Sequence, residues 1–91
     1  MENTIQPGIY KHFKGGFVLV LFCAKHSDRE EVEVVYNGLN NGKFYARPIE
    51  SFCEVVDSES GKQPRFSLST TDDAKEFITS DIRELIKTFN I

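Results

Sequence analysis

The feature of this sequence that most constrains its fold is an unbroken run of apolar residues from Phe17 to Ala24. β-Branched and aromatic residues dominate the run, which favours a strand over a helix. Its eight residues are far fewer than the roughly 20 that cross a bilayer. A strand that is apolar at every position is typical of a sheet centre with both faces covered. The run therefore predicts the central strand of a sheet.

Shorter strand patterns surround this run and are separated by turn residues. The pair Gly15-Gly16 and the stretch Asn37–Gly42 carry the Gly and Asn residues that tolerate positive φ in tight turns. The predicted flanking segments are strands at Ile9–Phe13, Glu31–Tyr36, Lys43–Arg47, Phe52–Val56 (after a helical turn from Ile49) and Pro64–Ser69, with an exposed loop at Asp57–Gln63. Five or six short strands with hairpin turns predict a mainly β (α+β) fold. Its architecture is either a small bent antiparallel sheet or an SH3-like barrel.

The C-terminal stretch 71–90 has a helical pattern instead. Thr71–Asp73 offers N-cap candidates, and apolar residues then recur at helical spacing. A second capping signal, Thr79-Ser80-Asp81, predicts that the helix breaks there. We expect the helix to cover one open side of the sheet; the alternative is that part of it forms a homodimer interface. The chain 1–91 is then a single domain with a β-rich part at 7–69.

Aromatic residues dominate the predicted core. Besides the central strand, it is expected to contain Phe13, Phe44, Phe52, Phe66, Phe77 and Leu85. The two cysteines, Cys23 and Cys53, stand in apolar surroundings, and they are expected to be buried reduced thiols. The N-terminus lacks the basic and apolar regions of a secretory signal, so a cytoplasmic protein without membrane association is predicted.

The net charge of −3 at pH 7 argues against a general binder of polyanions. The charge is uneven, however, because residues 1–27 carry a net +2 whereas residues 28–59 carry −5. This pattern is compatible with a local cationic patch on an acidic body. Broad attachment to nucleic acid through counterion release is not favoured.

The first predicted strand is bounded by glycines and has two unlike faces. Side chains alternate between the faces of a strand. One set, which can supply core, is Ile9, Lys11 and Phe13. The other set is Tyr10, His12 and Lys14. A phenol, an imidazole and an ammonium in a row are unusual on an outer face unless something is bound there, so this face is the first candidate binding surface.

Several motifs follow one another along residues 7–68. They are Gly8-x-Tyr10-x-His12-Phe13-Lys14-Gly15, His26-Ser27, Val34-Val35-Tyr36, Arg47-Pro48 with Phe52, and Pro64-Arg65-Phe66. In this order and spacing they resemble the signature of the "domain of unknown function 1653" family of small, mainly bacterial proteins. The resemblance implies a compact β-rich domain, similar in character to SH3-like barrels, with no established activity, substrate or cofactor. Phe13 stands where Tyr is common in the family, and Asp28-Arg29-Glu30 replaces the more usual Glu-Thr.

The residues that match this signature are enriched in aromatic and cationic side chains. Arg presents a rigid fork suited to carboxylate or phosphate, and aromatic rings offer flat stacking area. Such a group suits an anionic small molecule, a nucleotide-like ligand or an acidic peptide. The predicted ligand-binding residues are Tyr10, His12, Lys14, His26, Arg47 and Arg65. The alternative is that Tyr10 and Tyr36 belong to the core and that the arginines pair with Glu31, Glu33, Glu50 or Glu54.

Other chemistries are weaker hypotheses. Cys23-x-x-His26 resembles half a zinc site that His12 and Cys53 would complete, but residues 23 and 26 would point to opposite faces of a strand unless the turn begins before His26. Acid–base catalysis by His12 or His26 and single-stranded nucleic-acid binding beside Tyr45 are the alternatives that stay open. The prediction is a non-catalytic binding module without metal or cofactor. Its expected partner is an anionic ligand or a protein, and its expected state is a monomer or a homodimer through the C-terminal helix.

Overall fold

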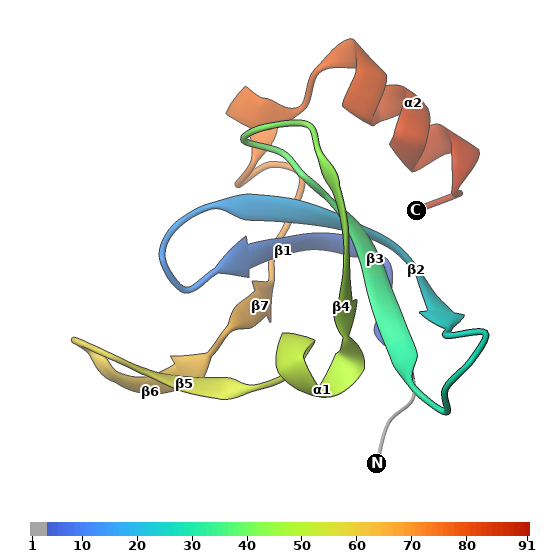
Figure 1. Cartoon of the computed structure of the whole chain (residues 1–91). Helices are drawn as coiled ribbons and strands as arrows, with labels where there is room; N and C mark the ends of the chain where they lie inside the picture. Colours follow the sequence, from blue (N-terminus) through green and yellow to red (C-terminus); the bar gives the residue numbers. More distant parts are fainter. Residues whose placement is uncertain (1–3) are drawn as a thin grey trace.

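The computed structural model describes residues 4–91, which form an antiparallel sheet, a smaller sheet and a C-terminal helix (Figure 1). The elements in chain order are β1 Gly8–His12, β2 Phe17–Lys25, β3 Val32–Gly38, β4 Phe44–Pro48, α1 Ile49–Phe52, β5 Val55–Ser58, β6 Gly61–Pro64, β7 Phe66–Leu68, the 3-10 helix η1 Lys75–Phe77, and α2 Ser80–Thr88. The main sheet has the strand order β4-β3-β2-β1-β7, and β5 pairs with β6 alone. Because β4 and β7 form separate edges, the sheet does not close into a barrel. Of the two predicted architectures, the bent antiparallel sheet is confirmed.

The apolar run forms β2, the central strand, as predicted. On one side β2 pairs with β1, where Tyr10 lies opposite Val18. On the other side it pairs with β3, where Tyr36 lies opposite Val20. The register with β3 shifts between Val20 and Phe22, so one residue is inserted as a β-bulge.

Each face of the main sheet carries its own hydrophobic core. On the first face, called here the α1 face, the buried residues are Tyr10, Val18, Val20, Val34, Tyr36, Ile49, Phe52 and Phe66. On the second, the α2 face, they are Ile9, Leu19, Leu21, Leu39, Ala74 and Ile82. Since β2 supplies side chains to both cores, it is apolar at successive positions.

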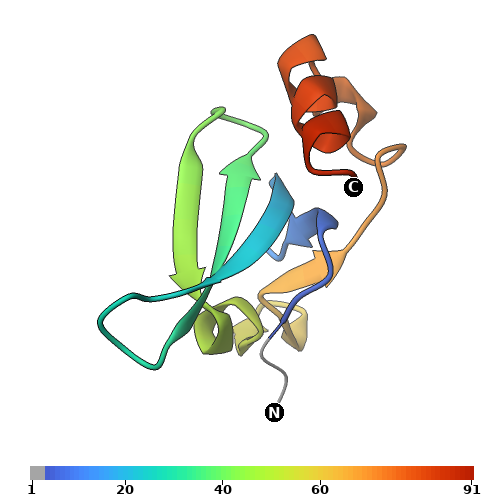
Figure 2. The ribbon, with the colours of Figure 1, turned by 90° about the vertical axis from the view of Figure 1, so that its right-hand side faces the viewer.

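The C-terminal helical segment covers the α2 face, as predicted (Figure 2). It is interrupted at the predicted place, because η1 ends at Phe77 and α2 begins at Ser80. Thr79 is the N-cap of α2, and its Oγ1 accepts a hydrogen bond from the Ile82 N–H at 3.3 Å. The ring of Phe89 packs 5.6 Å from that of Phe22 and extends this cover to the end of β2. Within residues 4–91 no helix has the length and apolar character needed to cross a bilayer.

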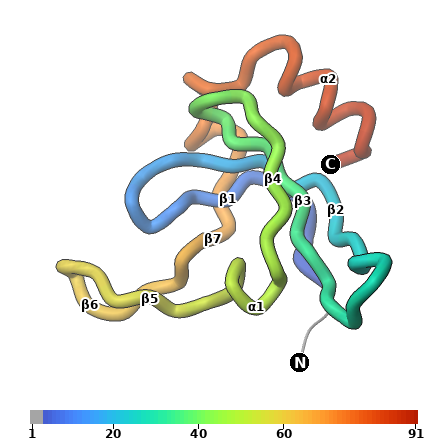
Figure 3. Tube along the Cα trace, viewed as in Figure 1, coloured from blue at the N-terminus to red at the C-terminus, as the bar shows by residue number. Residues whose placement is uncertain are grey.

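The predicted loop at Asp57–Gln63 is instead part of the β5–β6 hairpin, which extends away from the main sheet (Figure 3). Asp57 pairs with Lys62 and Ser58 with Gly61. Gly61 has a φ of 104°, which only glycine adopts readily, so it permits the tight turn. The hairpin was not predicted because its side chains are mostly exposed and polar, and they lack the alternation of a half-buried strand.

Three core predictions are wrong. Phe22, near the end of the central strand, is 40% exposed, and its ring packs beside that of Phe89. Phe44 is 59% exposed, because it lies on edge strand β4 beside an open hollow. Cys53 is exposed, since it caps the C-terminal end of α1, whose buried residues are Ile49 and Phe52. The other thiol, Cys23, is half-buried and its Sγ accepts a hydrogen bond from the backbone N–H of residue 5 at 3.3 Å. The remaining predicted core residues are buried or half-buried: Phe13, Phe52, Phe66, Phe77 and Leu85.

Candidate functional site

A hollow of about 300 Å³ opens on the α1 face between the β1–β2 turn and the β3–β4 turn. Five strands and two turns contribute to its lining, which places residues that are far apart in sequence around one opening. The lining residues used below are His12, Tyr36, Asn41, Tyr45, Arg47 and Phe66. We call this hollow the cationic cleft.

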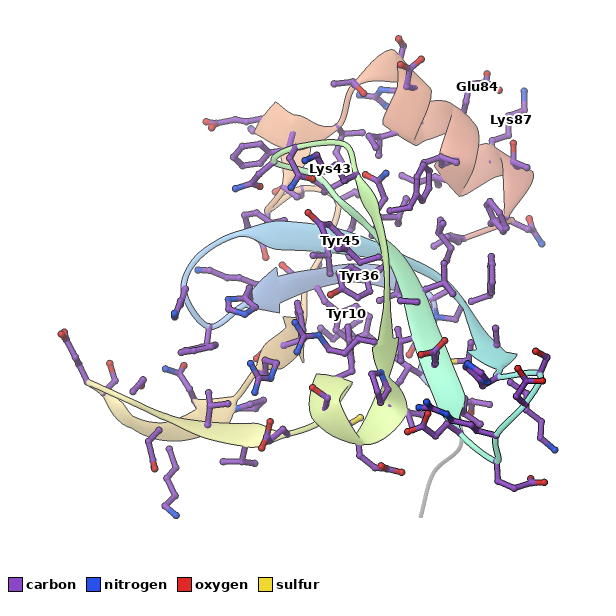
Figure 4. The ribbon with its side chains drawn as sticks, in the orientation of Figure 1. Tyr10, Tyr36, Lys43, Tyr45, Glu84 and Lys87 are labelled. Carbon is purple, nitrogen blue, oxygen red and sulfur yellow. The ribbon has the colours of Figure 1, made fainter. Side chains whose placement is uncertain are left out.

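Aromatic rings form the wall of the cationic cleft. The ring of Tyr36 stacks on that of Tyr45 at 5.5 Å and meets that of Phe66 at 5.8 Å. The imidazole of His12 meets the edge of Phe66 at 5.0 Å. Tyr36 is buried whereas Tyr45 is 41% exposed. Tyr36 covers one face of the Tyr45 ring, as Figure 4 shows, and the partial exposure of Tyr45 leaves other ring surface open for stacking.

Arg47 lies in the cleft and is held by neutral groups. Its Nε donates to the Tyr36 hydroxyl at 3.3 Å and its Nη1 donates to Ser51 Oγ at 3.0 Å. The guanidinium carbon lies 5.9 Å from the centre of the Phe66 ring. Within the described chain, Arg47 takes part in none of the ion pairs. Its position is fixed while its charge stays uncompensated.

Arg65 lies near the cleft but is engaged by an acid. Its Nη2 forms an ion pair with Glu54 Oε1 at 2.6 Å, and its Nε donates to the Ser51 carbonyl at 3.1 Å. The alternative in which the arginines pair with neighbouring glutamates is therefore right for Arg65 and wrong for Arg47.

His12 lies close to the positive charges of Arg47 and Arg65. Burial lowers its pKa below the ordinary 6.5, and the positive charges of Arg65, Arg47 and Lys14 lower this pKa further. Its Nδ1 accepts a hydrogen bond from the Lys14 backbone N–H at 3.1 Å. The neutral ring consequently carries its proton on Nε2 and keeps that N–H as a donor.

Lys14 completes the cationic group at the margin of the cleft. It is exposed, and its Nζ lies 5.7 Å from the centre of the Phe13 ring. Like Arg47, it forms no ion pair within residues 4–91. Four of the six predicted ligand-binding residues are thus brought together. His12 and Arg47 line the cleft, and the charges of Lys14 and Arg65 lie close enough to His12 to lower its pKa.

Tyr10, the fifth predicted residue, is part of the core of the α1 face. Its ring meets the ring of Phe52 edge-on at 5.4 Å, and its hydroxyl donates to the Gln6 carbonyl at 2.8 Å. Burial raises its pKa above 10.0, with smaller contributions from Cys53 and Cys23. The expectation of an open outer face fails at this residue, since α1 packs over it.

His26, the sixth predicted residue, lies in the β2–β3 turn and away from the cleft. Its Nδ1 accepts a hydrogen bond from the Asp28 N–H at 3.1 Å, which stabilises the turn. It borders a separate hollow of about 390 Å³ that only residues 25–30 line. Among residues 4–91, no three His, Cys, Asp or Glu side chains gather closely enough to hold a metal ion.

The β3–β4 turn contributes cleft residues that sequence reasoning missed. Asn41 Nδ2 donates to the Tyr45 hydroxyl at 2.7 Å and thereby orients that ring. A Cβ at Gly38 would lie 2.9 Å from Asn41 Oδ1 and 3.2 Å from Tyr45 Cε2. Tyr45, which was considered from the sequence only for the nucleic-acid alternative, precedes Arg47 by two residues and so shares its face of β4.

Comparison with known proteins places the cleft within a matched region. Residues 8–68 match the family described as "Protein of unknown function (DUF1653)". The fold is similar to the crystal structure of a DUF1653 protein from Bordetella bronchiseptica, with a TM-score of 0.68 and 35% sequence identity, over 72% of this chain and 88% of that chain. No match was found among curated proteins. All the cleft residues lie inside the matched range, whereas η1 and α2 lie outside it.

Proposed function

The chain belongs to the DUF1653 family of proteins of unknown function, and we propose that it is a non-catalytic binding module whose cationic cleft holds an anionic ligand. The observation that carries this proposal is Arg47. It is a partly buried guanidinium oriented by Tyr36 and Ser51 but paired with no carboxylate within residues 4–91. An arginine held in this way is ready to form charge-assisted hydrogen bonds with a carboxylate or phosphate.

Three features support an anion over a cation. Lys14 and Arg65 add positive charge around His12, and these charges add to burial, the larger cause, in lowering the pKa of His12. The neutral imidazole offers an N–H donor at Nε2. An anion in the cleft would offset the repulsion between the cations, so its binding is expected to raise the pKa of His12 above that of the free protein.

The aromatic wall points to a ligand with a flat part. Tyr45 presents a partly exposed ring at the mouth of the cleft, and a planar group stacking there would lie beside Arg47. A volume of about 300 Å³ is at the lower end of the range for ligand pockets. A nucleotide-like molecule, a small aromatic acid or one acidic side chain of a peptide meets both requirements.

The proposal is tested by titrating the protein with a nucleoside monophosphate, benzoate and a glutamate-rich peptide, followed by amide and imidazole NMR shifts. We expect at least one probe to shift the His12 resonances, and Arg47→Gln to weaken that probe about ten- to hundredfold through loss of charged hydrogen bonds. Arg83→Gln on α2 is the matched control, and it should leave the affinity unchanged. The proposal fails if every probe spares His12, or if Arg47→Gln and Arg83→Gln weaken binding equally.

The alternative functions stay predictions, and two further measurements separate them from the binding of a small anion. Stacking of bases on Tyr45 beside Arg47 would extend to single-stranded nucleic acid, whose affinity falls steeply with salt, whereas one small anion shows a shallow dependence. Of the two histidines considered for acid–base catalysis, only His12 lines the cleft. A turnover assay with each bound probe, comparing the wild type with His12→Gln, distinguishes catalysis from binding.

A further inference from the structure

A second hollow, of about 510 Å³, lies on the α2 face between the β3–β4 turn and α2. Its apolar walls include Leu39, Phe44 and Phe77, and its polar lining includes Asn37, Asp81 and Glu84. Figure 4 marks the two sides, with Lys43 at the β3–β4 turn and Glu84 on α2. No Lys or Arg is among the lining residues in the described part of the chain. We call this hollow the acidic hollow.

Asn37, which lines the acidic hollow, carries a buried hydrogen-bond acceptor without a donor among the described residues. It is 2% exposed, and its side chain is one of the largest fully buried ones. Its Nδ2 donates to the Gly42 carbonyl at 3.0 Å, which fixes the orientation of the amide. Its Oδ1 is buried and has no hydrogen-bond partner within residues 4–91. A buried acceptor without a donor is costly, so an external donor that reaches Oδ1 would be bound favourably.

The acidic side chains of the hollow indicate that the group donating to Asn37 Oδ1 is positively charged. Asp81 and Glu84 are three residues apart on α2 and therefore neighbours on one side of the helix. Neither takes part in an ion pair among residues 4–91. The basic residues of the same helix, Arg83 and Lys87, line a different hollow, although Lys87 is three residues from Glu84 and lies next to it in Figure 4. A cation is thus favoured in the acidic hollow, and an anion is repelled.

The apolar walls determine the rest of the ligand. Phe44 is 59% exposed and lies directly opposite Asn37 across the β3–β4 pair. An apolar body that packs on this ring removes it from water while the cationic end points toward Asn37. Because Oδ1 lies below the surface, seating the donor requires a side chain to shift, and the exposed Phe44 has little packing to lose.

We propose that the acidic hollow binds an ammonium- or guanidinium-bearing ligand with an apolar body. An N–H of the ligand donates to Asn37 Oδ1, Asp81 and Glu84 balance its charge, and its body packs on Phe44. The same chemistry is presented by a free aryl- or alkylamine and by a lysine or arginine side chain. The groups proposed to bind this ligand differ from those of the cationic cleft on the opposite face of the sheet, although Asn40 and Asn41 line both hollows.

The test uses phenethylammonium as the probe and the side-chain amide of Asn37 as the NMR reporter. We expect a saturable shift of that amide together with shifts along α2. The N,N,N-trimethyl analogue has the same charge and ring but no N–H, so it should bind about tenfold more weakly, as expected for a lost charged hydrogen bond. Phenylacetate, with the opposite charge, should not shift the Asn37 amide.

Two variants separate charge from fold. Asp81→Asn combined with Glu84→Gln keeps exposed polar side chains and should weaken phenethylammonium about fivefold, since surface charges act through solvent. Glu76→Gln on η1 removes one exposed acid outside the acidic hollow and should leave the affinity unchanged. A lysine-containing peptide that shifts Asn37 at lower concentration than the free amine identifies a protein side chain as the natural occupant; the reverse order identifies a small amine.

Three results would overturn the proposal. The first is equal binding of the trimethylated analogue, because the donor would then be irrelevant. The second is an Asn37 amide that does not shift at saturating phenethylammonium. The third is a crystal structure at saturating probe in which a water molecule donates to Oδ1 and the acidic hollow is otherwise unoccupied.

Discussion

The two faces of the sheet carry hollows of opposite character around one turn. On the α1 face, Arg47 and His12 lie against aromatic rings, and on the α2 face, Asn37 lies near the carboxylates of Asp81 and Glu84. Both hollows are lined by Asn40 and Asn41 of the β3–β4 turn. Groups of opposite charge are therefore presented on the two faces of one sheet, which the net charge of −3 does not reveal.

Strand geometry explains this separation. Consecutive residues of β3, Tyr36 and Asn37, point to opposite faces, and so do their partners on β4, Tyr45 and Phe44. One pair of neighbouring strands thereby supplies an aromatic wall to the cationic cleft and an amide acceptor with an apolar wall to the acidic hollow. The comparison teaches that a thin sheet of this size is able to present two unrelated binding chemistries.

The largest loss of stability is expected from Phe52→Ala, which removes packing from the α1 face only. The ring of Phe52 is buried and stacks on that of Phe66 at 4.3 Å, so its loss should lower the free energy of unfolding by about 3–5 kcal/mol. Phe44→Ala, the exposed counterpart on the other face, should cost less than about 1 kcal/mol. Urea unfolding measures both. Equal losses would show that the two faces are not packed differently.

A smaller effect is expected from Thr79→Ala, which loosens the α2 face. The variant removes the N-cap hydrogen bond to Ile82 and should cost about 1 kcal/mol. Amide hydrogen exchange should quicken in α2 while the His12 resonances of the cationic cleft stay in place. Thr88→Ala, at the other end of α2, is the control and should have a lesser effect. If the His12 resonances move as much as those of α2, the hollows are not independent.

The smallest expected effect is a pH dependence of the free energy of unfolding that arises from His12 in the cationic cleft. The pKa of His12 is lowered in the folded state, so between that pKa and 6.5 the unfolded chain holds more protons and stability rises with pH. We expect the free energy of unfolding to fall as the pH drops through 6.5 and to level off below the folded-state pKa. This component should vanish in His12→Gln and persist in His26→Gln. Persistence in His12→Gln would show that the cations do not act through His12.

The local patterns that were predicted correctly share one property: they depend on short-range chemistry. The apolar run at Phe17–Ala24 formed the sheet centre, and the capping signal at Thr79 began α2. The family-like motifs also contained the cleft residues His12 and Arg47. By contrast, Phe44 was wrongly predicted to be buried, because the hydrophobicity of a residue does not reveal whether its strand lies at the edge of the sheet.

Parity along β1 was determined by the sequence alone, because side-chain alternation in a strand needs no tertiary information. That is why Tyr10 and His12 were assigned correctly to one face. Only the tertiary structure decided that α1 covers Tyr10 while His12, two residues further on, borders an open cleft. The covering residues Ile49 and Phe52 come from about 40 positions later in the chain. Which part of a face stays open depends on where such distant segments pack, and no local pattern contains that information.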